Sequence, residues 1–200
     1  MGTVKVTNIE PIADNGTVTL GSSGDTIVTG SGVTANSFGL AEVDMWRLTA
    51  NLTITGDATD DITANLERVD TNNFNYIGTG MSQSSGIFTF PSTGIYQVSA
   101  TGTAYGGLDI AYFHFDISTT TDNSTYTSSQ STNNHTHNGF YGQATGTIFF
   151  DVTDTSNCKV KFRIYHSNSG VLQGSTTKMT TFFKFIRLGD TWWQMKIIYN

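Results

Sequence analysis

Apolar and polar residues alternate along most of the chain beyond residue 40, with the period of two that is typical of β-strands. In the clearest run, residues 46–54, every second residue is apolar, beginning with Trp46 and ending with Ile54. Further alternating runs cover residues 62–66, 74–77, 108–118, 144–152, 158–164 and 181–186. No stretch has the apolar spacing of a helix of about three turns. The pattern predicts an all-β sandwich of roughly eight to ten strands.

Residues 86–98 carry two alternating runs with a turn signal between them. The residues that alternation places on one face of each run are Phe88, Phe90, Tyr96, Val98 and Ala100. Pro91 has the fixed φ of an early turn position, and Gly94 has the backbone freedom that a turn exit needs. We therefore predict a buried hairpin here.

The run 108–118 has bulky side chains on both faces. One face holds Ala111, Phe113, Phe115 and Ile117, and the other holds Ile110, Tyr112, His114 and Asp116. Because a strand in a sandwich has one face on the core, the second face is expected to meet another surface.

Three segments differ from this pattern. Residues 119–138 are almost entirely polar and predict a long exposed loop or a loose hairpin, and long loops are often functional. Residues 1–38 alternate very short β-like pieces with Gly, Ser and Asp, which predicts a separate stem or anchor, or else a flexible linker. The head domain would then be residues 39–200. The apolar tail 192–200 is either a last core strand or a docking surface, since it would aggregate if left exposed.

Composition excludes several classes of function. Charged residues are only 13% of the chain, and the net charge is −6 with a pI near 4.9, so no nucleic-acid partner is expected. No run of about 18 apolar residues occurs, so no membrane span is expected. Cys158 is the only cysteine, which rules out an internal disulfide. Its place in an alternating run predicts a small buried strand residue.

The spacing Gly86-x-Phe88-x-x-Pro91-x-x-Gly94-x-Tyr96-x-Val98 resembles the signature of the complement-type globular head. That head belongs to the superfamily that includes tumour necrosis factor. Residues 181–188 are similar to the closing core strand of the family, and the resemblance covers about residues 42–189. It implies a jelly roll of about ten antiparallel strands that assembles as a homotrimer.

The low-complexity stretch 16–27 resembles leader segments of bacteriophage virion and tail-fibre proteins. Together, the two resemblances imply a phage virion protein, a trimeric fibre or spike whose head contacts a host-surface receptor. Residues 1–38 or the tail 192–200 would contact other virion proteins. The alternative is a head decoration or cement protein that stabilises the particle without binding a receptor.

Aromatic and amide side chains near the polar segment suit a glycan receptor, because aromatic faces cover sugar C–H surfaces and amides bond to hydroxyls. The aromatic residues concerned are Tyr105, Tyr126, Phe140, Tyr141 and Tyr165. Our predicted binding residues are Tyr126, His135, His137 and Tyr141.

No metal or other cofactor is expected. His135-Thr136-His137 is interpreted as an exposed pair, although three copies in a trimer would bring six imidazoles together for an octahedral metal. The carboxylates in the turns at 57–61 and 151–154 lack the spacing of a calcium loop and are interpreted as solvated.

No catalytic residues are predicted, so we expect no enzymatic activity. The sequence has no recognisable Ser/His/Asp set, and no pair of carboxylates stands out as a glycan-cleaving site. Such sites are defined by geometry in space, which leaves a glycan-active enzyme as a third interpretation.

Overall fold

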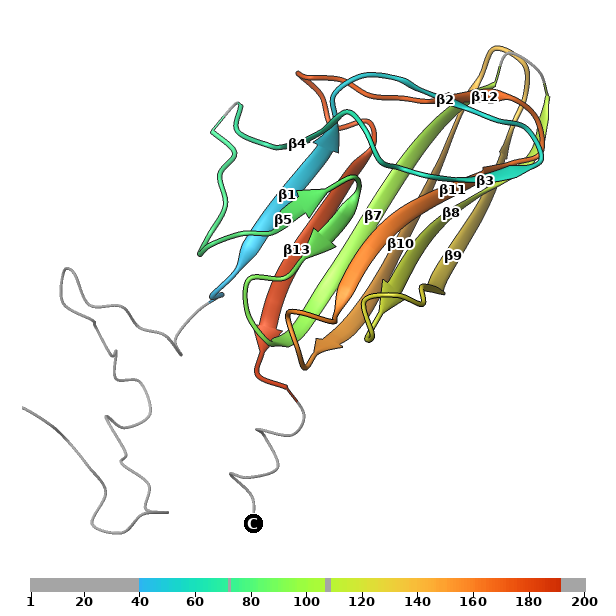
Figure 1. The fold of residues 1–200 in the computed structure, drawn as a ribbon. Coiled ribbons are helices and arrows are strands. Elements are labelled where there is room, and N and C mark those ends of the chain that lie inside the picture. The colour runs from blue at the N-terminus through green and yellow to red at the C-terminus, as the bar shows by residue number, and fades with distance from the viewer. Residues whose placement is uncertain (1–39, 72, 107–108, 192–200) are drawn as a thin grey trace, which may run out of the picture. The chain divides into compact units, whose positions relative to one another are not determined.

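The computed structural model describes residues 40–71, 73–106 and 109–191. The predicted stem or anchor at 1–38 and the tail at 192–200 lie outside the described residues. Within the described part, the chain forms thirteen β-strands in two antiparallel sheets, and no helix long and apolar enough to cross a membrane is found there (Figure 1). The predicted all-β sandwich is confirmed.

Sheet A has seven strands arranged around β7 (Gly94–Gly106). On one side, β10 (Tyr141–Val152) pairs with nearly the full length of β7. On the other side, β7 pairs first with β13 (Phe182–Gly189) and then with β12 (Gly170–Leu172). The sheet continues from β13 to β1 (Val43–Leu48) and β4 (Leu66–Arg68), and from β12 to β2 (Leu52–Ile54).

Sheet B has six strands arranged around β11 (Lys159–His166). One side of β11 pairs with β8 (Ile110–Thr120), which in turn pairs with β9 (Thr127–Thr136). The other side pairs with β3 (Ala58–Asp61) and with β6 (Ile87–Thr89), and β5 (Ser82–Ser84) follows β6.

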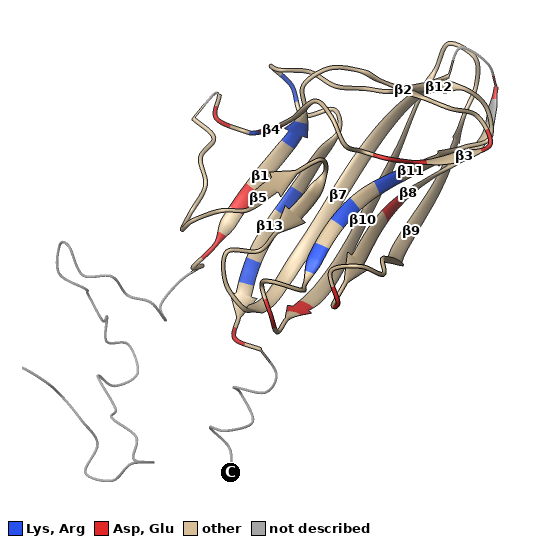
Figure 2. Ribbon diagram, viewed as in Figure 1, with Lys and Arg blue, Asp and Glu red and all other residues tan. Residues whose placement is uncertain are grey.

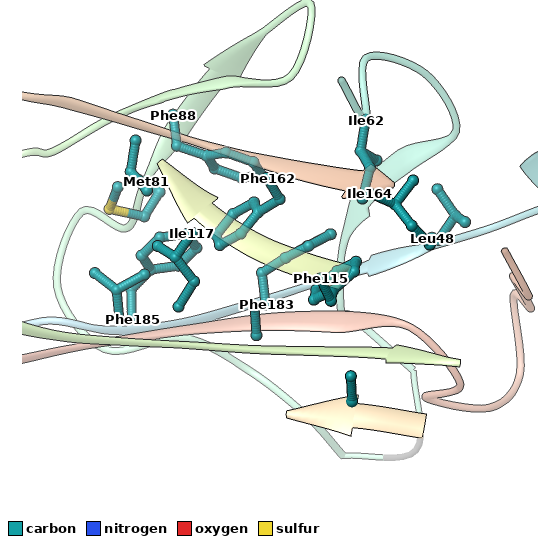
Figure 3. Packing of buried hydrophobic residues seen from close by; sticks show 14 of the residues in the cluster. Leu48, Ile62, Met81, Phe88, Phe115, Ile117, Phe162, Ile164, Phe183 and Phe185 are labelled. Atoms are coloured by element: carbon teal, nitrogen blue, oxygen red, sulfur yellow. The ribbon is translucent and has the colours of Figure 1, made fainter. Parts of the chain in front are cut away.

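Aromatic side chains from both sheets fill the space between them (Figure 3). The rings of Phe162 in sheet B and Phe183 in sheet A stack with their centroids 4.1 Å apart. Of the two bulky faces predicted for residues 108–118, the one that carries Phe113, Phe115 and Ile117 points into this core. Cys158 is 1% exposed, so its predicted burial is confirmed.

The predicted hairpin at 86–98 is wrong, although its side-chain directions are right. Strand β6 belongs to sheet B and β7 to sheet A, so the two runs face each other across the core and do not pair. The Phe90 and Tyr96 rings meet there, with centroids 4.7 Å apart. The turn between them therefore crosses from one sheet to the other, a gap of about 10 Å in sandwiches.

Three other local predictions need correction. The run 46–54 is not one strand: it breaks between β1 and β2, because β1 pairs with β13 whereas β2 pairs with β12. Residues 74–77 form no strand, and only Ile77 makes an isolated bridge, to Val43. The turn predicted at 56–61 contains β3, which pairs with β11.

The polar segment 119–138 is an ordered hairpin and not a long loop. Half of it is β9, whose residues pair with β8 from Thr127 to Thr136. The hairpin turn is stabilised by Asp122, whose carboxylate accepts hydrogen bonds from the Thr120 hydroxyl and the Ser124 and Thr125 amides. Strand count exceeds the predicted ten because several strands are only three residues long.

Candidate functional site

Four connections meet at the end of the sandwich where β8 begins, and we call this the loop end (Figure 1). It comprises residues 106 and 109, the turn 137–140, the turn 167–169 and the turn 55–57. Asp109 links two of these connections. Its carboxylate accepts a hydrogen bond from the Asn138 amide at 2.7 Å, and its carbonyl accepts one from the Asn168 side chain at 2.7 Å. These bonds hold the turns against one another.

The two histidines of the predicted site lie together at the loop end. The His135 and His137 rings are edge-to-face with centroids 5.8 Å apart. His137 Nδ1 is 3.6 Å from Asp109 Oδ1, and both side chains are largely exposed. In the described part of the chain, no three His, Cys, Asp or Glu side chains are grouped as a metal site.

Tyr141 begins β10 and lies on the outer face of sheet A. Its cross-strand partner is Tyr105, and the two ring centroids are 5.0 Å apart. Tyr141 and its neighbour Phe140 are each 66% exposed. Tyr141 is thus close to the histidines in the sequence, but its side chain lies on the outer face of sheet A, whereas His135 belongs to β9 of sheet B.

Tyr126 is far from the other predicted binding residues. It lies in the β8–β9 hairpin turn, at the other end of β8 from the loop end. The Lys161 ammonium is 4.6 Å from the centre of the Tyr126 ring, and the Tyr126 hydroxyl is buried without a hydrogen-bond partner. Burial, followed by the charges of Asp61 and Asp122, raises the pKa of the Tyr126 phenol.

A cluster of aromatic rings lies on the outer face of sheet B, beside the loop end; sequence reasoning named Tyr165 as suited to a glycan but missed that it meets Tyr112 and His114. Tyr112 and Tyr165 have nearly parallel rings with centroids 5.7 Å apart, and His114 lies against both. Alternation placed Tyr112 and His114 on one face, but only the pairing of β8 with β11 sets Tyr165 opposite His114.

The Tyr165 hydroxyl donates a hydrogen bond to Asp57 Oδ1 at 3.2 Å. Hydrogen bonding with Tyr112, then burial, and after these the nearby Asp57 carboxylate raise the pKa of Tyr165 to about 12. The phenol is therefore protonated at any physiological pH and remains a donor. Asp57 is held in place by its own backbone amide, which donates to the His166 carbonyl at 2.8 Å.

His166 is a fully buried histidine beneath the loop end. Its Nδ1 is 3.0 Å from the Asn168 carbonyl, while its Nε2 is buried without a partner. Phe113 and Gly170 pack against the ring, and a Cβ at Gly170 would come within 2.5 Å of it. Burial is the main cause that lowers the pKa of His166, although the Asn168 carbonyl and Asp60 oppose it.

We expect acid to weaken the fold through His166. The unfolded chain binds a proton on this histidine below about pH 6.5, whereas the folded chain resists protonation to a lower pH. The free energy of unfolding should therefore fall as pH drops from about 6.5 towards the lowered pKa of the folded state. Urea unfolding from pH 5 to 8 should show a smaller pH slope for His166→Phe than for the wild type. Exposed His135→Asn should keep the wild-type slope, and equal slopes for all three proteins would contradict the assignment.

No protein-family model matches the sequence, and no curated protein matches it. Solved structures with the same architecture do exist. Murine APRIL at pH 5.0 aligns with a TM-score of 0.55 and 14% identity, over 74% of this chain and 98% of that chain. Eiger TNF from S. frugiperda aligns with a TM-score of 0.55 and 10% identity, over 74% and 93%. The PRD1 vertex protein P5 scores 0.48 at 13% identity, over 76% and 99%, which is too low to support any assignment.

Identities of 10–14% show a common fold and nothing more. The motif at 86–98 and the strand at 181–188 predicted a resemblance over about residues 42–189. That range is about the same share of the chain as the 74% that aligns. The described residues therefore form a jelly roll of the tumour-necrosis-factor type, as the sequence predicted.

Proposed function

We propose that this chain is a structural protein of a bacteriophage particle, a non-enzymatic homotrimeric fibre or spike whose head contacts a host-surface receptor. The proposal assigns the protein to the virion. Its support is the resemblance of residues 16–27 to phage leader segments, joined to a jelly-roll head. The contrast between the two outer faces of the sandwich is the observation that carries it.

The part of the outer face of sheet A that β7 and β10 form is suited to contact between copies of the chain, and Lys184 of β13 lies beside it, opposite Ser99. Strands β7 and β10 contain a single charged residue between them, Asp151. At the centre of this face, hydroxyl groups pair across the strands, Thr101 with Thr145 at 3.0 Å and Thr147 with Ser99 at 2.9 Å. Aromatic side chains flank them, and Phe149 is 70% exposed. Exposed apolar surface with so little charge is typical of a protein–protein interface.

The outer face of sheet B has the opposite character. Charged residues follow one another along β11, namely Lys159, Lys161 and Arg163, and Asp116 lies on the neighbouring β8 (Figure 2). Such a face is costly to bury between copies and is better suited to solvent or to a polar ligand. In the proposed trimer, sheet A would face the partner copies and sheet B the surroundings. Three copies of a weak receptor site would then hold the particle through their high effective concentration.

A cement role is the second candidate, and an exposed apolar cluster favours it. Leu40, Phe74, Tyr76 and Ile77 are each 41–51% exposed, and the bridge between Ile77 and Val43 brings the segment 74–77 beside the start of β1. Such a cluster could dock on a neighbouring virion protein, with or without receptor binding.

The assembly is tested by light scattering coupled to gel filtration. Three chains of 21.7 kDa should give a particle of about 65 kDa, and Phe149→Glu on sheet A should shift it to the monomer mass. Ser131→Glu, an exposed change on β9 of sheet B, should remain trimeric. A wild-type monomer would overturn the trimer.

Adsorption of the purified protein to host cells supports the receptor role, whereas binding only to particles that lack the protein supports the cement role.

A further inference from the structure

We infer that the aromatic cluster on the outer face of sheet B, formed by Tyr112, His114 and Tyr165, is a binding site for a neutral sugar ring. The inference rests on the proposed receptor role and makes it specific, because it names both the site and the chemical class of the receptor. The predicted binding residues Tyr126, His135, His137 and Tyr141 are not part of this site.

The rings form one continuous aromatic surface. The His114 ring centroid lies 5.3 Å from that of Tyr112 and 5.4 Å from that of Tyr165. Tyr112 is 44% exposed, although its ring is large and apolar. A sugar presents C–H groups on the face of its ring, and these pack against exposed aromatic rings without needing a hydrogen bond. The cluster therefore offers the apolar part of a sugar site.

Hydrogen-bonding groups flank the rings on both sides. Asp57, from the turn between β2 and β3, accepts one hydrogen bond from Tyr165, at 3.2 Å. A carboxylate has about four acceptor positions, so Asp57 can also accept bonds from sugar hydroxyls. On the other side, Asn133 of β9 is the cross-strand partner of His114 and is exposed. Its amide can both donate and accept.

The Asp57 backbone adopts an uncommon conformation that aims its side chain at this face. Its φ is +54°, in the left-handed region that aspartate tolerates better than most residues. The amide bond to the His166 carbonyl holds the turn there at 2.8 Å. The acceptor is thus fixed before any ligand arrives, which reduces the entropy lost on binding.

The charges around the cluster favour a neutral sugar over an acidic one. The nearest cations on β11 are Lys161 and Arg163; both are paired with Asp61, at 2.8 Å and 3.1 Å, and a second carboxylate, Asp116, is the cross-strand partner of Arg163. Asp57, in contrast, forms no ion pair among the described residues. An anionic sugar would meet this carboxylate without a free cation to balance it, whereas hydroxyl groups would donate to it.

Binding of the full-length protein to a printed array of neutral hexose, N-acetylhexosamine and sialylated oligosaccharides tests the site. Neutral glycans should be retained, and Tyr112→Ala should weaken their binding by roughly tenfold or more. Tyr165→Phe keeps the ring but removes the hydrogen bond to Asp57, and should cause a smaller loss. Phe74→Ala, an exposed aromatic residue outside both this site and the proposed sheet A interface, should leave binding unchanged.

Several results would overturn the inference. These are no retention of any glycan, retention of sialylated glycans alone, or unchanged binding by Tyr112→Ala with an unaltered thermal unfolding midpoint. Host-cell adsorption without glycan retention would reject this site and leave the proposed function standing. Glycan retention without adsorption would reject the receptor role and leave the site standing.

Discussion

Replacement of Asp44 by alanine is expected to lower the free energy of unfolding by about 3–5 kcal/mol. Asp44 is 2% exposed, and its carboxylate pairs with the Arg68 guanidinium at 3.0 Å. It also accepts hydrogen bonds from the Trp46 indole at 2.9 Å and the Met81 amide at 2.7 Å. The alanine variant would leave these donors buried without their acceptor and would separate β1 from β4 and from the segment before β5.

Urea unfolding at constant protein concentration measures this loss. Asp190→Ala is the matched control, since Asp190 also pairs with an arginine, Arg187, but is 59% exposed. Exposed pairs contribute at most about 1 kcal/mol, so the control should remain near wild-type stability. Equal destabilisation by the two variants would show that Asp44 does not anchor these strands.

Phe88→Ala is expected to destabilise the fold to a similar extent, by about 3–5 kcal/mol. The Phe88 ring is fully buried at the centre of the core (Figure 3). Its centroid lies 5.2 Å from that of Phe185, 5.4 Å from Trp46 and 5.5 Å from Phe162. These partners come from both sheets, so the cavity left by alanine would weaken the contact between the sheets.

Denaturant unfolding of Phe88→Ala and Phe88→Leu separates the stability lost with side-chain volume from the stability lost with the shape of the ring. Leucine fills most of the space and should cost less than about 1.5 kcal/mol. A loss for Phe88→Ala below that of Phe88→Leu would contradict the central place of this ring in the core.

The candidate site was only partly predictable, because its residues come from segments far apart in the sequence. His135 and His137 were expected to lie together, since side chains two positions apart share one face of a strand. Tyr126 was grouped with them by its nearness in the sequence, but β8 and β9 separate it from the loop end. Tyr112, Tyr165 and Asp57 meet only through the pairing of β8 with β11 and the turn before β3.

The amino-acid pattern was enough to predict the fold class and part of the core. Alternation is a local property of each strand, so Phe88, Phe90, Tyr96 and Val98 could be assigned to the core without knowing the partners of their strands. The spacing of residues 86–98 also pointed to the correct jelly-roll family of folds.

The pairing of the strands became clear only from the three-dimensional arrangement. Residues 86–98 read equally well as a hairpin or as two strands facing each other across the core, because alternation sets the direction of a side chain and not the partner of its strand. Pairing depends on backbone hydrogen bonds between distant segments, as when β11 joins β3, β6 and β8. Those pairings placed the nearly uncharged strands β7 and β10 side by side in sheet A, and they gave sheet B the aromatic cluster that we propose binds a sugar.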